Sequence, residues 1–165
     1  MQIAGIDPGP KLTGLVIAEW VGSCRDVEKI LYKGKIPNED VIPICQGCDC
    51  AVVEMVACYG MPVGKEVFET VKWIGRFECM LDRELKIWHT ELYRMQVKMQ
   101  MCRSPKANDG TIRQALIDRY GGKEKAIGLK KTPGILYGLS GDCWSALALI
   151  QTYIETRGFL PSAAA

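Results

Sequence analysis

The stretch Ile3-Ala4-Gly5-Ile6-Asp7-Pro8-Gly9-Pro10 predicts a strand that ends in a tight turn, and the rest of the fold is organised around it. Residues 11–18 are again β-prone and predict a second strand that pairs back as a hairpin. Asp7 then stands at the exposed end of a strand, where a half-buried carboxylate is costly without a cation or a donor beside it. Two interpretations remain open here: a metal-coordinating acid, or a turn residue that caps its own backbone.

Length and composition predict one globular domain. With 165 residues, the chain can bury a core without disulfides, and we expect a single domain over 1–158 followed by a tail at 159–165. The hydrophobic share of 48% and the charged share of 24% are typical of soluble proteins. No apolar run is long enough to cross a bilayer and no signal-peptide pattern is present, so we expect a cytoplasmic protein without a membrane partner.

The chain contains eight cysteines, which we expect to be reduced thiols in the cytosol. Cys45, Cys48 and Cys50 include a Cys-x-x-Cys pair with zinc-ligand spacing. No second pair follows, and His89 is the only histidine of the sequence. A turn between a helix and a strand is therefore favoured over a structural metal site.

Hydrophobic patterns predict alternating strands and helices, hence an α/β fold. Strands are expected at 2–6, 12–19 and 28–36 as a meander, with the third at an edge, then at 50–57 and 86–90. Helices are expected at about 65–85, after 104–109, and from Ser140 as N-cap to the C-terminal region, while 97–102 lies near the sheet and 123–138 forms a basic loop.

The helix predicted at 65–85 has two apolar faces. Its expected core stripe runs along one face and comprises Val67, Val71, Ile74, Leu81 and Leu85. Gly75 lies beside the stripe and is expected to permit close approach to the sheet. Trp73 and Phe77 lie off the stripe, which indicates a second packing surface and a candidate subunit interface.

Two further acids stand in suggestive places. Glu54 lies in or at the end of a continuous apolar strand, where an unpaired carboxylate is disfavoured unless it meets a cation. Asp142 falls in the first turn of the last predicted helix, where the helix dipole alone already favours an acid.

The segments around these acids resemble the RuvC-type Holliday junction resolvases. The resemblance is carried by Gly5-Ile6-Asp7-Pro8-Gly9, by Val52-Val53-Glu54, and by Asp142-x-x-Ser145-Ala146-Leu147-Ala148. The runs 59–67 and 112–119 resemble the phage-borne branch of that family. The likeness extends over about 1–157, and the order and spacing of the motifs make it specific.

The resemblance implies a ribonuclease H-like fold with a mixed five-stranded sheet flanked by helices. It further implies a homodimer that binds four-way DNA junctions and nicks two strands symmetrically with Mg²⁺ or Mn²⁺, two ions per site. By analogy Asp7 would bridge both ions, Glu54 would hold one and Asp142 the other. Hard oxygen ligands suit these ions. A phage-encoded protein would act in the host cytoplasm.

The sequence departs from the family pattern at Ser145, where bacterial members usually carry a further Asp. Ser145 lies one helical turn after Asp142 and is expected to position a metal-bound water. Asp109 is a further acid near the basic segment that has no position assigned by the sequence. The loss of one acid opens an alternative function, a non-catalytic dimer that binds DNA junctions.

Basic side chains then become candidate DNA contacts. Phosphate contacts give affinity without sequence reading. The candidates are Lys98, Arg103, Lys106, Arg113, Lys130 and Lys131, with Tyr59 as a residue that could stack at the junction centre. Two other classes, a nucleotide-binding domain of the actin and sugar-kinase type and a zinc module, fit less well, the former because its cleft needs two domains.

Overall fold

The structure is a computed structural model, and it describes residues 1–58, 60 and 62–156. A five-stranded sheet in the order β3-β2-β1-β4-β5 forms its centre. Its strands are β1 (Gln2–Asp7), β2 (Leu12–Glu19), β3 (Lys29–Pro37), β4 (Cys50–Met55) and β5 (Trp88–Tyr93). The pairs β1–β2 and β2–β3 are antiparallel, whereas β1–β4 and β4–β5 are parallel. This confirms the predicted mixed sheet.

The hairpin of β1 and β2 is fixed by its turn. Asp7 pairs with Gly14 at the end of the hairpin that lies next to the turn. The Thr13 hydroxyl donates to the Asn38 side-chain oxygen (2.7 Å), and the Asn38 amide donates to the carbonyl of Gly9 (3.0 Å). Thr13 and Asn38 are buried, so this network holds the turn after Asp7 in one position.

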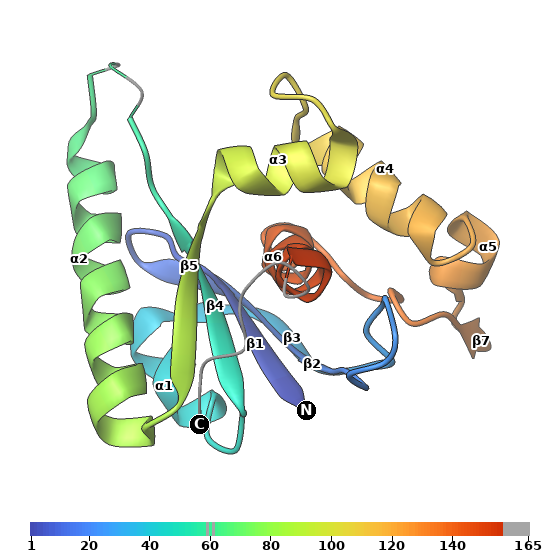
Figure 1. The fold of residues 1–165 in the computed structure, drawn as a ribbon, viewed down its shortest axis with the longest axis horizontal. Coiled ribbons are helices and arrows are strands. Elements are labelled where there is room, and N and C mark those ends of the chain that lie inside the picture. The colour runs from blue at the N-terminus through green and yellow to red at the C-terminus, as the bar shows by residue number, and fades with distance from the viewer. Residues whose placement is uncertain (59, 61, 157–165) are drawn as a thin grey trace.

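Helices cover both faces of the sheet (Figure 1). One face carries α1 (Val41–Ile44) and α2 (Lys65–Met80), which continues into the π-helical turn η2 (Leu81–Leu85); a short 3-10 turn, η1 (Asn38–Asp40), precedes α1. The other face carries α6 (Cys143–Thr156), and α3 (Arg94–Cys102) and α4 (Asp109–Arg119) cover α6 in turn. Nearly every residue of α6 is therefore buried, not only the predicted stripe.

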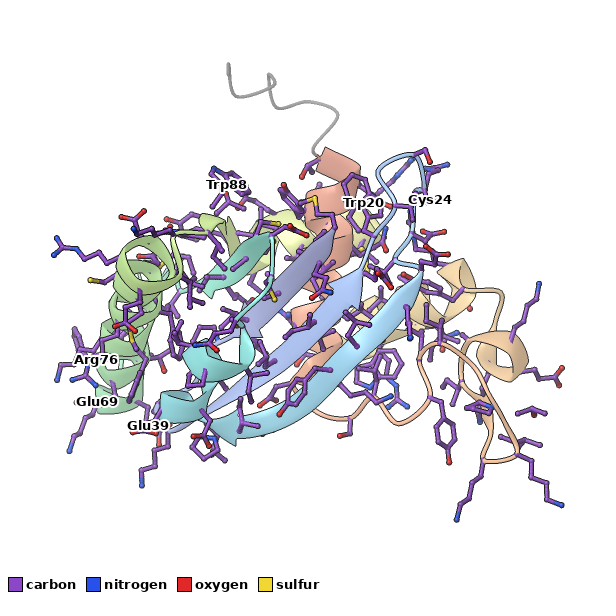
Figure 2. All side chains as sticks on the ribbon, turned by 90° about the horizontal axis from the view of Figure 1, so that it is seen from below. Trp20, Cys24, Glu39, Glu69, Arg76 and Trp88 are labelled. Carbon is purple, nitrogen blue, oxygen red and sulfur yellow. The ribbon has the colours of Figure 1, made fainter. Side chains whose placement is uncertain are left out.

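The inner face of α2 differs from the prediction. Ile74 and Leu81 are fully buried as expected, but Phe77 is also fully buried and belongs to the core, so it is not part of a second surface. Val71 is exposed on the outer side, where Figure 2 also shows Glu69 and Arg76. A Cβ at Gly75 would meet no atom within 4 Å, so this glycine does not allow close packing on the sheet.

Three other segments differ from expectation. The stretch from Arg94 is a helix, α3, and β5 extends to Tyr93. The basic stretch after Gly122 contains a one-turn helix, α5 (Lys123–Ala126), and a short hairpin of β6 (Gly128–Leu129) and β7 (Thr132–Pro133). In the first backbone hydrogen bond of α6, the Ala146 amide donates to the Asp142 carbonyl. Asp142 and not Ser140 is therefore the N-cap residue.

The cysteine cluster is packed into the protein interior. Cys45, Cys48 and Cys50 are all buried. Burial raises the pKa of the Cys45 thiol to about 12 and that of Cys48 to about 11, which favours the protonated thiol over a metal-binding thiolate. Among the residues described, none of the helices is long and apolar enough to span a bilayer.

Candidate active site

Two glycines bring the start of α6 onto the hairpin. A Cβ at Gly5 would lie 2.1 Å from the carbonyl oxygen of Ala146, and a Cβ at Gly14 would lie 2.6 Å from the Cβ of Asp142. Only a residue without a side chain fits at either position. Because Gly14 is the register partner of Asp7, the same packing sets Asp142 beside Asp7.

Asp7 and Glu54 lie on one face of the sheet, the face that α6 covers. Side chains alternate along a strand, and Ile6 and Val53, the preceding residues, pack on the opposite side against α2. Both acids stand at the carboxyl ends of adjacent parallel strands. The two carboxyl groups share a hydrogen bond.

This crowding perturbs Asp7 strongly. The pKa of Asp7 is raised to about 9, chiefly by burial and further by the charge of Glu54, the hydrogen bond to Glu54 and the charge of Asp142, while Arg94 lowers it. Glu54 and Asp142 thus both act on Asp7 at one end of the sheet. Such a cluster has a free-energy cost that a bound cation would relieve.

Two basic residues flank the acids. Lys35 on edge strand β3 forms an ion pair with Asp142, with 2.6 Å between Nζ and Oδ2. Arg94, the first residue of α3, lies with its Nη1 3.6 Å from Glu54 Oε1 and donates a hydrogen bond to Ser145 Oγ (3.2 Å). The other guanidinium nitrogen forms an ion pair with Asp109.

The donor set suits a hard divalent cation. Carboxylate oxygens are the ligands preferred by Mg²⁺ and Mn²⁺, and the raised pKa of Asp7 marks a deficit of positive charge beside it. Within the described residues, however, no three His, Cys, Asp or Glu side chains already form a group that could hold an ion. Asp142 is held by Lys35 and Glu54 by Arg94, so the acids have to turn toward an ion to bind it.

A row of hollows follows this edge of the sheet. A cleft of about 210 Å³ contains Asp7, Glu54 and Arg94, a second of about 280 Å³ contains Arg94, Asp142 and Ser145, and a third of about 790 Å³ contains Asp142. Shared residues join them end to end. A larger cleft, about 1010 Å³, lies at the other end of α6 around Trp20 and Cys24 (Figure 2), away from the acids.

Of the predicted DNA-contacting residues, the structure brings Arg113 to this row of clefts. Its guanidinium stacks 4.8 Å from the Trp144 ring centre, and it lines the same hollow as Asp142. Arg103 lines the distant cleft near Trp20, and Lys106 lines a hollow beside α4. The remaining three lysines line none of these hollows: Lys98 lies on α3, and Lys130 and Lys131 lie at the turn of the β6–β7 hairpin. Tyr59 lies outside the described residues.

Sequence reasoning missed four basic residues at this edge: Lys35, Arg94, Lys11 and Lys65. Lys35 is the register partner of Gly14, so a correct alignment of the β2–β3 hairpin would have indicated it. Arg94 follows β5, whose end lies beside that of β4, but the strand was predicted to end too early. Lys11 and Lys65 line the cleft beside Asp142.

The comparisons with known proteins identify the fold. No protein-family model matches the chain, and no curated protein does. Among solved structures, RuvC of Thermus thermophilus is similar, with a TM-score of 0.69 and 19% identity over 96% of each chain. T. thermophilus RuvC in complex with a Holliday junction substrate gives a TM-score of 0.70 and 18% identity, again over 96% of each chain.

A viral enzyme has the same arrangement at lower similarity. The Fowlpox virus resolvase, in complex with its substrate Holliday junction DNA, gives a TM-score of 0.54 and 17% identity over 95% of this chain and 99% of that chain. At such identities the likeness concerns the fold. The chain has the RuvC-like, ribonuclease H-like fold: a mixed five-stranded sheet with helices on both faces.

Proposed function

We propose that this protein is a metal-dependent endonuclease that cuts branched DNA, and four-way junctions in particular. The observation that carries the proposal is the meeting of Asp7, Glu54 and Asp142 at one edge of the sheet. The fold adds support, because two resolvases described with Holliday junction DNA share it over nearly the whole chain.

The carboxylates are the groups that would hold Mg²⁺ or Mn²⁺. When bound, such ions supply an activated water and stabilise the leaving oxygen of the cleaved phosphodiester. Asp7 would be the central ligand, with Glu54 on one side and Asp142 on the other. Ser145 has a hydroxyl on the Arg94 side of the site, where it can orient a water molecule.

DNA would lie along the row of clefts. Lys11, Lys65 and Arg113 line it and provide positive charge for phosphates. Contacts to the arms of a junction are assigned to residues farther from the acids: Lys98, Arg103, Lys106, Lys130 and Lys131, with Tyr59 at the centre of the junction. Such contacts select the shape of the DNA, not its sequence.

We further propose a homodimer, because symmetric nicking of two strands needs two sites. The outer face of α2 supports this, since Phe68 is 58% exposed and Val71 is 44% exposed on it. Light scattering on the purified protein should give twice the mass of one chain. The double substitution Phe68→Ser and Val71→Ser should give one chain mass and break the pairing of nicks.

The direct test uses a synthetic four-way junction and a linear duplex of the same sequence. We expect nicks in the junction only, and only with Mg²⁺ or Mn²⁺. The variant Asp7→Asn should bind the junction and leave it uncut. Equal cutting of junction and duplex would remove the structural selectivity from the proposal.

The second candidate is a junction-binding dimer without catalysis. It is favoured by one observation: Ser145 is neutral and its hydroxyl already accepts a hydrogen bond from Arg94. Wild-type protein that binds junctions tightly but nicks none of them in either metal would establish this second function.

A further inference from the structure

We propose that Arg94 is a resident cation of the site that takes the place of one divalent ion, so that each site binds one ion and not two. The inference rests on the proposed function and concerns the number of ions that it uses. It starts from the position of Arg94, which no sequence motif assigned to the site.

Arg94 is fixed by partners from three separate elements. Its guanidinium lies 3.6 Å from Glu54 on β4, donates to Ser145 on α6 at 3.2 Å, and pairs with Asp109 at the start of α4. Its side chain is 26% exposed. A planar guanidinium offers five donors in a fixed fork, which suits such multiple contacts better than a lysine would.

The neutral residue Ser145, which lies beside Arg94, also supports a single ion. An ion on the Glu54 side of the site would gain no anionic ligand at position 145 of α6, because Ser145 provides only a hydroxyl. The Arg94 guanidinium already contacts both Ser145 and Glu54. A divalent ion placed there would repel the guanidinium across a few ångströms of partly buried space.

The charge balance also favours a single ion. Asp7, Glu54, Asp142 and Asp109, when ionised, bring four negative charges, and Lys35 and Arg94 contribute two positive charges within the ion-paired network. The remaining charge of two negative units is neutralised by one divalent ion. A second ion would leave this network with an excess of two positive charges.

The test counts bound Mn²⁺ from the electron paramagnetic resonance signal of the free ion, without reference to cleavage. Wild-type protein should bind one ion per chain at the site, and Asp7→Asn should lose it. Arg94→Gln should bind two, because Glu54 is released and a positive charge is gone. Arg94→Lys, which keeps the charge, should return to one.

Arg83→Gln is the matched control, since it removes the same charge from the exposed turn η2 at the other end of β5. It should bind one ion, as the wild type does. Circular dichroism of Arg94→Gln and Arg94→Lys checks that both are folded. Two ions in the wild type, or one ion in folded Arg94→Gln, would overturn the inference.

These outcomes separate the inference from the proposed function. A protein that nicks junctions and binds two ions per site keeps the function and loses the role of Arg94. A protein that binds no ion and nicks nothing loses both.

Discussion

Two carboxyl pairs lie on opposite faces of the same sheet. Asp7 and Glu54 face α6, whereas Glu78 on α2 meets Glu91 on β5 on the other face. In each pair burial is the main reason why one pKa rises, to about 9 for Asp7 and to about 7 for Glu78. Each pair also shares a hydrogen bond.

The pairs differ in what surrounds them. Arg94 contacts Glu54, a third acid acts on Asp7, and a chain of clefts opens beside them. Among the described residues, no ion pair involves Glu78 or Glu91, and one Glu78 oxygen is buried without a hydrogen-bond partner. An acid with a raised pKa therefore indicates a functional site only where basic residues and an open cleft lie beside it.

The largest contrast is expected in cleavage. Asp7→Asn removes the central carboxylate while keeping its shape, so nicking of a four-way junction should fall about a thousandfold. Glu78→Gln makes the same chemical change in the other pair and should leave the nicking rate unchanged. Single-turnover gel assays measure both rates, and equal losses in the two variants would abolish the distinction between the pairs.

A second contrast concerns how α6 reaches Asp7. Gly5→Ala places a methyl group against the Ala146 carbonyl, so we expect a loss of about 3 kcal/mol or more in the free energy of unfolding. Gly75→Ala on α2, where a Cβ meets no atom, should gain about 0.5–1 kcal/mol. Urea denaturation followed by circular dichroism compares the two. A neutral Gly5→Ala would show that the helix does not depend on this contact.

The two carboxyl pairs should also change the stability of the protein in different ranges of pH. A folded protein with a raised acid pKa keeps a proton that the unfolded chain has lost, so its stability falls as pH rises through that window. For Asp7 the window runs from its ordinary pKa of 3.8 to about 9, and for Glu78 it runs from an ordinary pKa of 4.5 to about 7. The slope due to Asp7 is at most about 1.4 kcal/mol per pH unit.

Thermal unfolding with EDTA present measures this dependence. Asp7→Asn should flatten the curve up to about pH 9, and Glu78→Gln should flatten it only below about pH 7. In parallel samples without EDTA, added Mn²⁺ should restore stability at high pH in the wild type, because the ion binds ionised carboxylates. Parallel curves for both variants and the wild type would contradict these assignments.

The smallest effect is expected for DNA affinity. Arg113→Gln removes one charge from the cleft beside Asp142, so junction affinity should fall less than about tenfold and the slope of log K against log salt by about 0.9. Arg83→Gln, on the side of α2, should change neither quantity. Fluorescence anisotropy over a salt series gives both, and equal slopes for all three proteins would place the DNA elsewhere.

Local patterns in the sequence were sufficient for the first four strands of the sheet. The turn after Asp7, the half-exposed alternation of β3 and the apolar run of β4 each report a local environment, and the structure confirms all three. The convergence of Asp7, Glu54 and Asp142 was predicted from a resemblance. Their roles as metal ligands remain predictions.

Features that depend on tertiary contacts could not be predicted from local sequence patterns. Helix α3 buries only Val97, so it has almost no apolar periodicity to detect. Helix α2 has apolar residues on two faces, and only contact with the sheet decides that Phe77 is inside and Phe68 outside. Arg94 joins the site because two strand ends are adjacent, which is a property of the register.

The wide spacing of the acids along the chain has a consequence for biosynthesis. Positions 7, 54 and 142 come from the first strand, the fourth strand and the last helix, so no partial chain short of α6 contains the whole set. A nascent polypeptide on the ribosome can pair its early strands before it contains all three acids. On the proposed function, cleavage therefore requires α6, the helix that also completes the core.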